Sequence, residues 1–206
     1  MQDEFLTALT AHQSAFGMTL TDTACASLAR YYEIVSEHNP LLHLVAPMPA
    51  EEFAIRHILE SLTMLEYLPS NARSIDVGTG AGLPSIPCLL VREDLRATLI
   101  ESKIKKAVFL ENAIGDLGLT ARVNIINRQF EEATPGGSQF VTCRALDKFT
   151  EKLPRLLKWS GQRGLLFFGG RSLGTELERR KVRFQQKLMP MSEQRYLFFA
   201  KRGFTR

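Results

Sequence analysis

The sequence predicts an α/β fold in which helices cover both faces of a parallel sheet and a helical cap precedes the sheet. Apolar residues recur at helical spacing through the first third of the chain, and strand-like runs alternate with helical runs after it. A glycine-rich turn joins the first of those strands to a helix. Strands that alternate with helices form parallel sheets with both faces covered. We therefore expect a cap over residues 1–70 and an α/β domain over residues 71–206.

The cap is expected to hold three helices, over residues 3–16, 21–39 and 51–68. Each of these stretches repeats apolar residues with the period of a helix. Thr21 is a favoured N-cap residue and is expected to start the second helix. Asn39-Pro40 is expected to end that helix, because the residue before a proline avoids the helical region.

Beyond residue 70 the expected elements alternate between strand and helix. The expected strands cover residues 73–77, 97–101, 122–127, 139–143 and 164–168. The expected helices cover residues 86–92, 103–117, 149–159 and 173–186. Residues 187–189 and 195–201 are expected to close the sheet as a hairpin.

Composition places the chain among ordinary globular proteins. It has 206 residues, of which 45% are hydrophobic and 23% charged, so a core is available and disorder is excluded. The uncharged stretch 77–91 is too short, and too rich in glycine and proline, to span a membrane. The cysteines are widely spaced and the first residues are acidic, which favours a reduced, cytoplasmic compartment. The histidines have no partners at metal-ligand spacing, so no metal is expected.

The sharpest motif is Asp76-Val77-Gly78-Thr79-Gly80-Ala81-Gly82, in which a strand runs into alternate glycines and then a helix. Glycine lets a ligand approach the backbone closely, and open α/β sheets bind ligands at this end of their strands. A dinucleotide fingerprint would need glycine where the chain has Leu83 or Ser85. The pattern looks instead like motif I of the S-adenosylmethionine methyltransferases. The alternative is a tight turn that binds no ligand.

Glu101 ends the second expected strand, 19 residues after Gly82. An acidic side chain at that place can accept hydrogen bonds from ribose hydroxyls, as it does in other nucleotide-binding folds. The alternative is a carboxylate that caps the helix beginning near Lys103. With the glycine turn upstream, the ligand role is the favoured interpretation.

Several segments together resemble one family, the bacterial small-subunit ribosomal RNA guanine-N7 methyltransferases, called RsmG or glucose-inhibited division protein B. The resemblance spans roughly residues 20 to 170, and its most specific string is Arg56-His57-Ile58-Leu59-Glu60-Ser61. The other matching strings are Ile75 to Gly80, Gly82-Leu83-Pro84, Ile86-Pro87, Glu101-Ser102, Lys105-Lys106, Phe109-Leu110, Glu131-Glu132 and Arg144-Ala145.

The resemblance implies a Rossmann-like, class I S-adenosylmethionine-dependent methyltransferase that methylates N7 of a guanine in 16S ribosomal RNA. It implies a monomer that acts on that RNA or on the small ribosomal subunit, without metal or membrane. Arg144 is implied to position the substrate, and its alternative is a surface salt bridge. Family contacts, motif I and the acid that ends the second expected strand together give the expected cofactor-binding residues: Asp76, Gly78, Gly80, Leu83, Glu101, Phe130, Glu131 and Arg144.

The chain departs from the family pattern at four places near the expected crevice. His43-Leu44-Val45 stands where the family has Asn-Leu-Thr, Ala81 replaces a proline, and Cys143 replaces a serine. Phe168-Gly169-Gly170 stands for Leu-Lys-Gly, so Gly169 takes the place of a lysine. Two alternatives therefore stay open: a methyltransferase of another substrate, and a catalytically silent RNA-binding paralogue.

Positive charge is concentrated in the last part of the chain. Residues 148–206 hold 15 Lys and Arg against 4 Asp and Glu, whereas the whole chain has a net charge of only +4. This asymmetry predicts a surface for a polyanion, with a solvated face as the alternative. The set Arg179, Arg180, Lys181 and Arg183 is expected to lie on one helix and to hold the RNA backbone, with residues 179 and 183 on one face.

The sequence allows two interpretations of His57. Histidines inside a helix are mostly structural, and this one can pack where the cap meets the sheet. It can also shape the pocket for the cofactor or the base.

Overall fold

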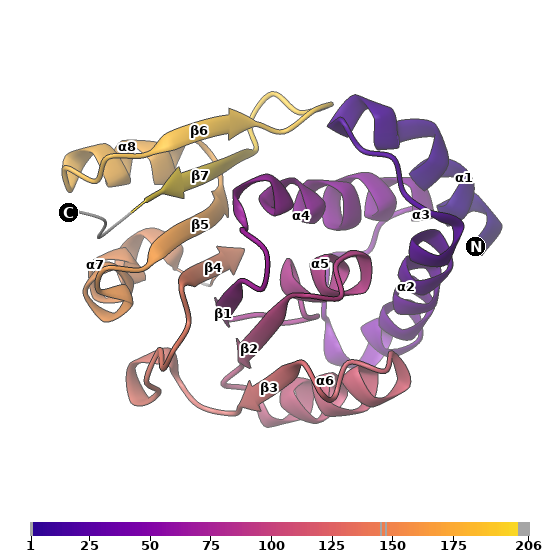
Figure 1. Cartoon of the computed structure of the whole chain (residues 1–206), viewed down its shortest axis with the longest axis horizontal. Coiled ribbons are helices and arrows are strands. Elements are labelled where there is room, and N and C mark those ends of the chain that lie inside the picture. The colour runs from indigo at the N-terminus through magenta and orange to yellow at the C-terminus, as the bar shows by residue number, and fades with distance from the viewer. Residues whose placement is uncertain (1, 145, 147, 202–206) are drawn as a thin grey trace.

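The structure is a computed structural model that describes residues 2–144, 146 and 148–201. Its centre is a seven-stranded sheet with the strand order β3-β2-β1-β4-β5-β7-β6 (Figure 1). Strands β3, β2, β1, β4 and β5 are parallel, and β7 runs antiparallel to both β5 and β6. The strands are β1 Arg73–Val77, β2 Arg96–Ile100, β3 Val123–Ile126, β4 Phe140–Arg144, β5 Gly164–Gly169, β6 Gln185–Leu188 and β7 Tyr196–Ala200.

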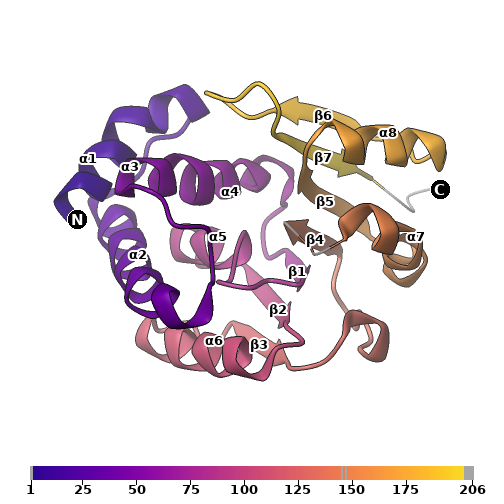
Figure 2. The ribbon, with the colours of Figure 1, turned by 180° about the vertical axis from the view of Figure 1, so that it is seen from behind.

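Helices lie on both faces of the sheet, as the sequence predicts. Leu165 and Phe167 of β5 pack in one core with α7 and α8, whereas Leu166 and Phe168 pack in another with the cap, α5 and α6. Successive side chains of a strand point to opposite faces, so a single strand contributes to both cores. Figures 1 and 2 show the sheet between these two groups of helices. The helices that follow β1 are α5 Ser85–Val91, α6 Ile104–Asp116, α7 Phe149–Ser160 and α8 Arg171–Arg179.

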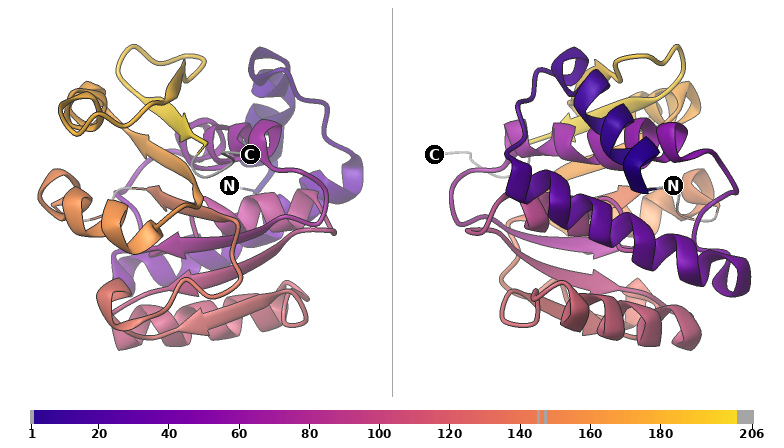
Figure 3. Two further views of the ribbon diagram at one scale, coloured as in Figure 1. Left: turned by 60° about the vertical axis from the view of Figure 1, so that its left-hand side comes forward. Right: turned by 90° about the vertical axis from the view of Figure 1, so that its right-hand side faces the viewer.

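The cap consists of two helices and a third helical run. Helix α1 packs against α2 and against the start of that run (Figure 3). Phe5 of α1 and Leu28 of α2 share a core with Leu99 of β2, so the cap packs directly on the sheet domain; the division at residue 70 stays a prediction. The elements are α1 Gln2–His12, η1 Gln13–Phe16, α2 Asp22–Leu42, α3 Ala50–Phe53, the π-helical η2 Ala54–Leu59, α4 Glu60–Leu62 and η3 Thr63–Tyr67.

The predicted end of the second helix is wrong. Thr21 caps α2 as expected, and its Oγ1 accepts a hydrogen bond of 3.2 Å from the Ala24 N–H. The helix then continues through Pro40 to Leu42. A proline in the last turn removes one backbone donor, but the His43 N–H still bonds to the Asn39 carbonyl at 2.9 Å. The side chain of Asn39 also accepts from the Val45 N–H at 2.9 Å, which fixes the chain as it leaves the helix.

The predicted helix over residues 173–186 is too long. Helix α8 ends at Arg179, and Lys181 has a positive φ of 56°. Strand β6 starts at Gln185, because residues 185–188 pair with β7. Pairing with a buried neighbouring strand outweighs the local helix propensity of this charged segment. Arg183 therefore lies outside α8, and the expected face shared by residues 179 and 183 of one helix does not exist.

The carboxyl ends of the parallel strands meet at one edge of the sheet, where the loops after β1, β2, β3 and β4 come together. The cap borders this edge, because the Tyr31 hydroxyl on α2 donates a hydrogen bond of 3.0 Å to the Ala81 carbonyl in the glycine turn. The fold thus brings the cap into contact with the glycine-rich turn that follows β1.

Candidate functional site

A cavity of about 780 Å³ opens at this edge of the sheet. Its walls come from the loops after β1 to β4 and from cap segments at residues 43–48 and 56–57. Most of the sequence-predicted site residues line it. They are Gly78, Gly80, Leu83, Glu101, Phe130 and Arg144. Asp76 and Glu131 are the two predicted residues that do not line it.

The glycine turn leaves backbone exposed toward the cavity. Gly80 has a φ of +58°, and a Cβ atom built there would meet nothing within 4 Å. Gly82 has a φ of +95°, but a Cβ there would lie 2.2 Å from the Ile86 side chain. Gly82 therefore lets the turn close onto α5, whereas Gly80 leaves open space in which a ligand can reach the backbone.

Asp76 lies beneath the turn rather than in the cavity wall. Its side chain is fully buried, and Oδ2 accepts a hydrogen bond of 2.8 Å from the Thr79 hydroxyl. Burial raises the pKa of Asp76 to about 7, although the bond from Thr79 acts in the opposite direction. The carboxyl group thus ties the end of β1 to the turn.

Glu101 lies in the cavity wall and also supports the neighbouring backbone. Its Oε2 accepts from the Gly80 N–H at 3.1 Å, and its Oε1 accepts from the Lys103 N–H at 2.8 Å. The carboxylate therefore joins the glycine turn to the start of α6. Each carboxylate oxygen has a further lone pair, so these bonds leave acceptor capacity for hydroxyl groups in the cavity.

Phe130 and Glu131 face different surroundings. Phe130 is buried in the cavity wall, and its ring meets Trp159 edge-on with centroids 5.6 Å apart. The carboxylate of Glu131 forms a 3.2 Å ion pair with Arg155 on α7. In this short turn, Phe130 therefore forms part of the apolar cavity wall, and Glu131 connects the turn to α7.

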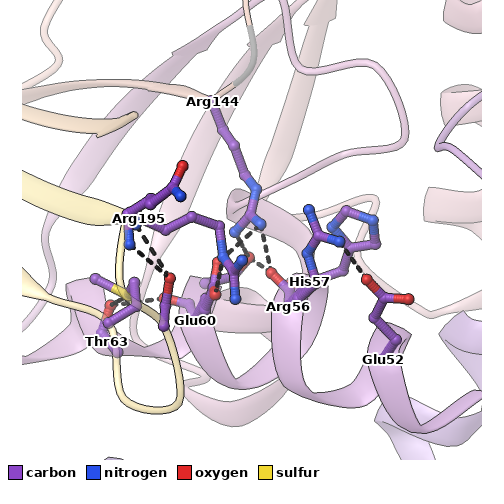
Figure 4. Close-up of polar contacts among 11 residues, drawn as sticks. Glu52, Arg56, His57, Glu60, Thr63, Arg144 and Arg195 are labelled. Carbon is purple, nitrogen blue, oxygen red and sulfur yellow. Dashed lines mark hydrogen bonds and ion pairs between the residues drawn. The ribbon is translucent and has the colours of Figure 1, made fainter. Parts of the chain in front are cut away.

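Arg144 is a buried clamp between β4 and the cap, and not a surface salt bridge. Its Nη2 donates to Glu60 Oε2 at 3.1 Å and to the Arg56 carbonyl (Figure 4). The other oxygen of Glu60 accepts from Arg195 Nε at 2.6 Å. The side chain of Glu60 is only 2% exposed, so one buried carboxylate holds two guanidinium groups. Burial lowers the pKa of Arg144, while Glu60 acts to raise it.

The π-helical turn η2 adds Arg56 and His57 to the cavity wall. The Glu60 N–H bonds to the Ile55 carbonyl, five residues back, so the helix is locally wider than an α-helix. The His57 ring packs edge-on against Phe53, with centroids 5.0 Å apart. Burial, together with the charges of Arg144, Arg56 and Arg195, lowers the pKa of His57 to about 3. The sequence alone allows two interpretations of His57 and predicts no role for Arg56, and the signal that it offers for both residues is the Arg-His-Ile-Leu-Glu-Ser string.

Several cationic side chains line the cavity. Lys103, Arg128 and Lys152 line it, and none forms an ion pair with a carboxylate of the residues that the structure describes. Lys106 also lines it and donates to the His43 carbonyl at 2.9 Å. We call Lys103, Lys106, Arg128 and Lys152 the cavity rim.

Two classes of feature are missing from residues 2–144, 146 and 148–201. No group of three or more His, Cys, Asp or Glu side chains is placed to hold a metal ion. No helix in these ranges has the length and apolar character needed to cross a membrane.

Comparisons with known proteins point to one family. Residues 24–198 match the family GidB, described as rRNA small subunit methyltransferase G. The ribosomal RNA small subunit methyltransferase G of Neisseria meningitidis serogroup C is 31% identical over 76% of this chain and 72% of its own length. The protein of that name from Pelotomaculum thermopropionicum is 43% identical over 50% of this chain and 44% of its own. A crystal structure of a SAM-dependent methyltransferase from Aquifex aeolicus shares the fold, with a TM-score of 0.56 and 16% identity over 82% of this chain and 97% of that one.

Proposed function

The chain belongs to the GidB family of small-subunit ribosomal RNA methyltransferases, and on that premise we propose that it methylates N7 of a guanine in 16S ribosomal RNA with S-adenosylmethionine as methyl donor. The observation that carries the proposal is the open backbone at Gly80, beside a cavity walled by Glu101 and Phe130. A strand, a glycine turn, a ribose-binding acid and an apolar wall are what a nucleoside-containing donor requires.

The cavity fits such a donor in size and in the order of its walls. Its volume of about 780 Å³ lies within the range of small-molecule sites. Phe130 follows β3, Glu101 follows β2, the glycine turn follows β1 and Arg144 ends β4, in the spatial order β3-β2-β1-β4. Strands lie about 4.8 Å apart, so these walls span roughly 14 Å. An extended ligand would place its adenosine toward Phe130 and Glu101 and its amino-acid end toward Arg144.

The remaining predicted residues act as supports in this proposal. Gly78 and Leu83 line the cavity at the two ends of the glycine turn. In the proposed complex they contact the donor with backbone and side-chain atoms. Asp76 fixes the turn through Thr79. Glu131 lies outside the cavity wall, and its ion pair with Arg155 connects the turn after β3 to α7.

Guanine N7 carries a lone pair and no proton, so no residue of the chain has to act as a general base. S-adenosylmethionine supplies an electrophilic methyl group on its sulfonium. The chain's task is to hold N7, the methyl carbon and the sulfur in line, and alignment of this kind accounts for several kcal/mol in model reactions, up to about 7–11. A guanine inside a helix has to leave its stack to reach the cavity.

We place the RNA backbone on the cavity rim. Lys103, Arg128 and Lys152 line the cavity and have no carboxylate partner within the described ranges. In the C-terminal part, Arg179 and Arg180 both bond to Glu176, and Lys187 bonds to Glu66. Cations without internal partners are the ones available to phosphates. We further propose that the enzyme is a cytoplasmic monomer and that its substrate is 16S RNA, free or in the small subunit.

The binding experiment uses S-adenosylhomocysteine as the probe and titration calorimetry as the readout. Gly80→Asp places a carboxylate in the open space of the turn and is expected to abolish binding. Gly118→Asp is the matched control, because Gly118 also has a positive φ, +68°, with nothing within 4 Å of a Cβ, and it does not line the cavity. Equal affinities of Gly80→Asp and the unaltered chain would contradict the site assignment.

A further inference from the structure

Three buried polar atoms in the cavity wall have no hydrogen-bond partner within the described part of the chain. They are Nε of Arg56 and both ring nitrogens of His57. The two residues are neighbours in η2, and both line the cavity. Buried polar atoms are partnered in the great majority of cases, so three such atoms on one turn call for an explanation. Their place in a cavity wall points to a ligand as the missing partner.

The charged groups nearest to these atoms make their contacts elsewhere in the structure. Glu52 pairs with the Nη1 end of Arg56, and Glu60 holds Arg144 and Arg195. Arg144 in turn directs its Nη2 to Glu60 and the Arg56 carbonyl. Figure 4 shows the side chains of Arg56 and His57 extending from their helix toward the side from which Arg144 descends.

The free atoms have a defined hydrogen-bonding character. Arg56 Nε–H is a donor, and a neutral imidazole offers one N–H donor and one acceptor. His57 is neutral at physiological pH, because burial and the surrounding guanidinium groups hold its pKa at about 3. The wall thus offers two donors in the field of Arg56, Arg144 and Arg195, a combination that suits an anionic oxygen acceptor.

We propose that Arg56 and His57 form the subsite for the carboxylate at the amino-acid end of the methyl donor. The carboxylate accepts hydrogen bonds from Arg56 Nε–H and from the protonated ring nitrogen of His57. This inference rests on the proposed function, which places adenosine at the β2–β3 side of the cavity and leaves the β1–β4 side for the other end. It assigns the direct contact to η2 and leaves Arg144 as the clamp that holds this turn against the sheet.

The test compares three ligands by calorimetry: S-adenosylhomocysteine, its decarboxylated analogue and 5′-methylthioadenosine, which lacks the whole amino-acid end. Arg56→Gln removes the guanidinium but keeps the backbone carbonyl that Arg144 uses. His57→Phe removes both nitrogens and keeps a ring to pack on Phe53. Arg30→Gln is the control, since Arg30 is also an ion-paired arginine but lies on α2 outside the cavity.

Each η2 variant is expected to bind S-adenosylhomocysteine about tenfold more weakly or worse, because a hydrogen bond to a charged group is lost. Affinity for the decarboxylated analogue and for methylthioadenosine should stay within about twofold of the unaltered chain. Arg30→Gln should bind all three ligands normally. Thermal unfolding of each variant verifies that it is folded.

Three results would overturn the subsite. Equal weakening for all three ligands would mean that η2 only supports the cavity. Unchanged S-adenosylhomocysteine affinity with weakened binding of small-subunit RNA would mean that the anion is a phosphate. An unaltered chain that binds none of the three nucleosides would instead overturn the methyl-donor cavity, and the subsite with it.

Discussion

Two glutamates each hold two arginines in this protein, and their surroundings differ. Glu60, with a side chain 2% exposed, joins Arg144 of β4 to Arg195 in the loop before β7. Glu176, with a side chain 16% exposed, bonds to Arg179 and Arg180 beside it at the end of α8. The first cluster connects three parts of the fold next to the cavity, whereas the second stays within one helical turn. A carboxylate that binds two guanidinium groups therefore connects separate elements at the Glu60 cluster, whereas at the Glu176 cluster it connects only residues of the same helix end.

The comparison shows why net charge alone does not locate an RNA surface. Residues 148–206 carry most of the excess positive charge, yet several of these cations are neutralised by neighbouring carboxylates. The rim cations Lys103 and Arg128 belong to the less basic part of the sequence and have no such partner among the described residues. Whether a cation can bind phosphate therefore depends on whether a neighbouring carboxylate already neutralises it, and not on how many cations a segment contains.

The largest expected effect comes from breaking the buried clamp. Glu60→Gln leaves Arg144 buried without a counter-charge, so we expect a loss of about 3–5 kcal/mol in the free energy of unfolding. Glu176→Gln is the matched control and should move the urea midpoint much less, because Arg179 is 69% exposed and Arg180 28% exposed, so water can solvate both cations once the carboxylate is removed. Similar losses in the two variants would contradict the distinction between clamp and surface cluster.

Asp76 and Glu176 are expected to change the stability of the fold with pH in opposite directions. The pKa of Asp76 is raised to about 7, so the folded state binds its proton more tightly and the wild-type chain loses stability as pH rises through about 4 to 7. The pKa of Glu176 is lowered to about 2, so its contribution is present above its ordinary pKa and is lost as pH falls toward 2. Asp76→Asn should therefore gain on the order of 3 kcal/mol relative to wild type between pH 4 and 7, measured by urea unfolding. A constant difference across that range would show that Asp76 does not titrate as described.

Two carboxylates near the cavity give a sharper test of its walls. Glu101→Ala should weaken S-adenosylhomocysteine binding by about 2 kcal/mol, because a hydrogen bond to a charged group is lost. Glu131→Ala should change that affinity little, since Glu131 lies outside the cavity wall and is paired with Arg155. If Glu101→Ala kept full affinity in calorimetry, its role would be limited to joining the glycine turn to α6.

The smallest expected effect distinguishes the rim from the C-terminal cations. Changing Lys103, Arg128 and Lys152 to Gln should weaken RNA binding roughly tenfold at low salt and reduce the salt slope by about 0.7 for each lost contact to single-stranded RNA. The same change at Arg179, Arg180 and Lys187, which are paired with Glu176 and Glu66, should leave both quantities near wild type. The reverse outcome in a salt series would return the RNA to the C-terminal part of the chain.

Local sequence predicted the strands and the glycine turn well, because β-rich runs and glycines act over a few residues. It did not predict that Pro40 stays inside α2, since a hydrogen bond to Asn39 and the packing of the cap decide that point. The end of α8 depends on pairing between β6 and β7. The clamp joins Glu60 to Arg144, 84 residues away, and such a contact has no local signal.

The structure also shows where the residues that depart from the family pattern lie. His43 and Val45 line the cavity, and Ala81 provides the carbonyl that Tyr31 binds. A Cβ at Gly169 would lie 2.6 Å from the side chain of Leu173, so any larger residue there requires that side chain to move. Gly169 is therefore consistent with the packing of this chain, and restoring a lysine there would disturb it.

The most direct test of the account is the identity of the methylated nucleoside. Small subunits from cells lacking this gene are incubated with the purified protein and isotope-labelled S-adenosylmethionine, and their RNA is digested and analysed by mass spectrometry. We predict label in 7-methylguanosine from 16S RNA, and none with Gly80→Asp. Label in another nucleoside, or no label with a chain that binds S-adenosylhomocysteine, would contradict the proposed reaction.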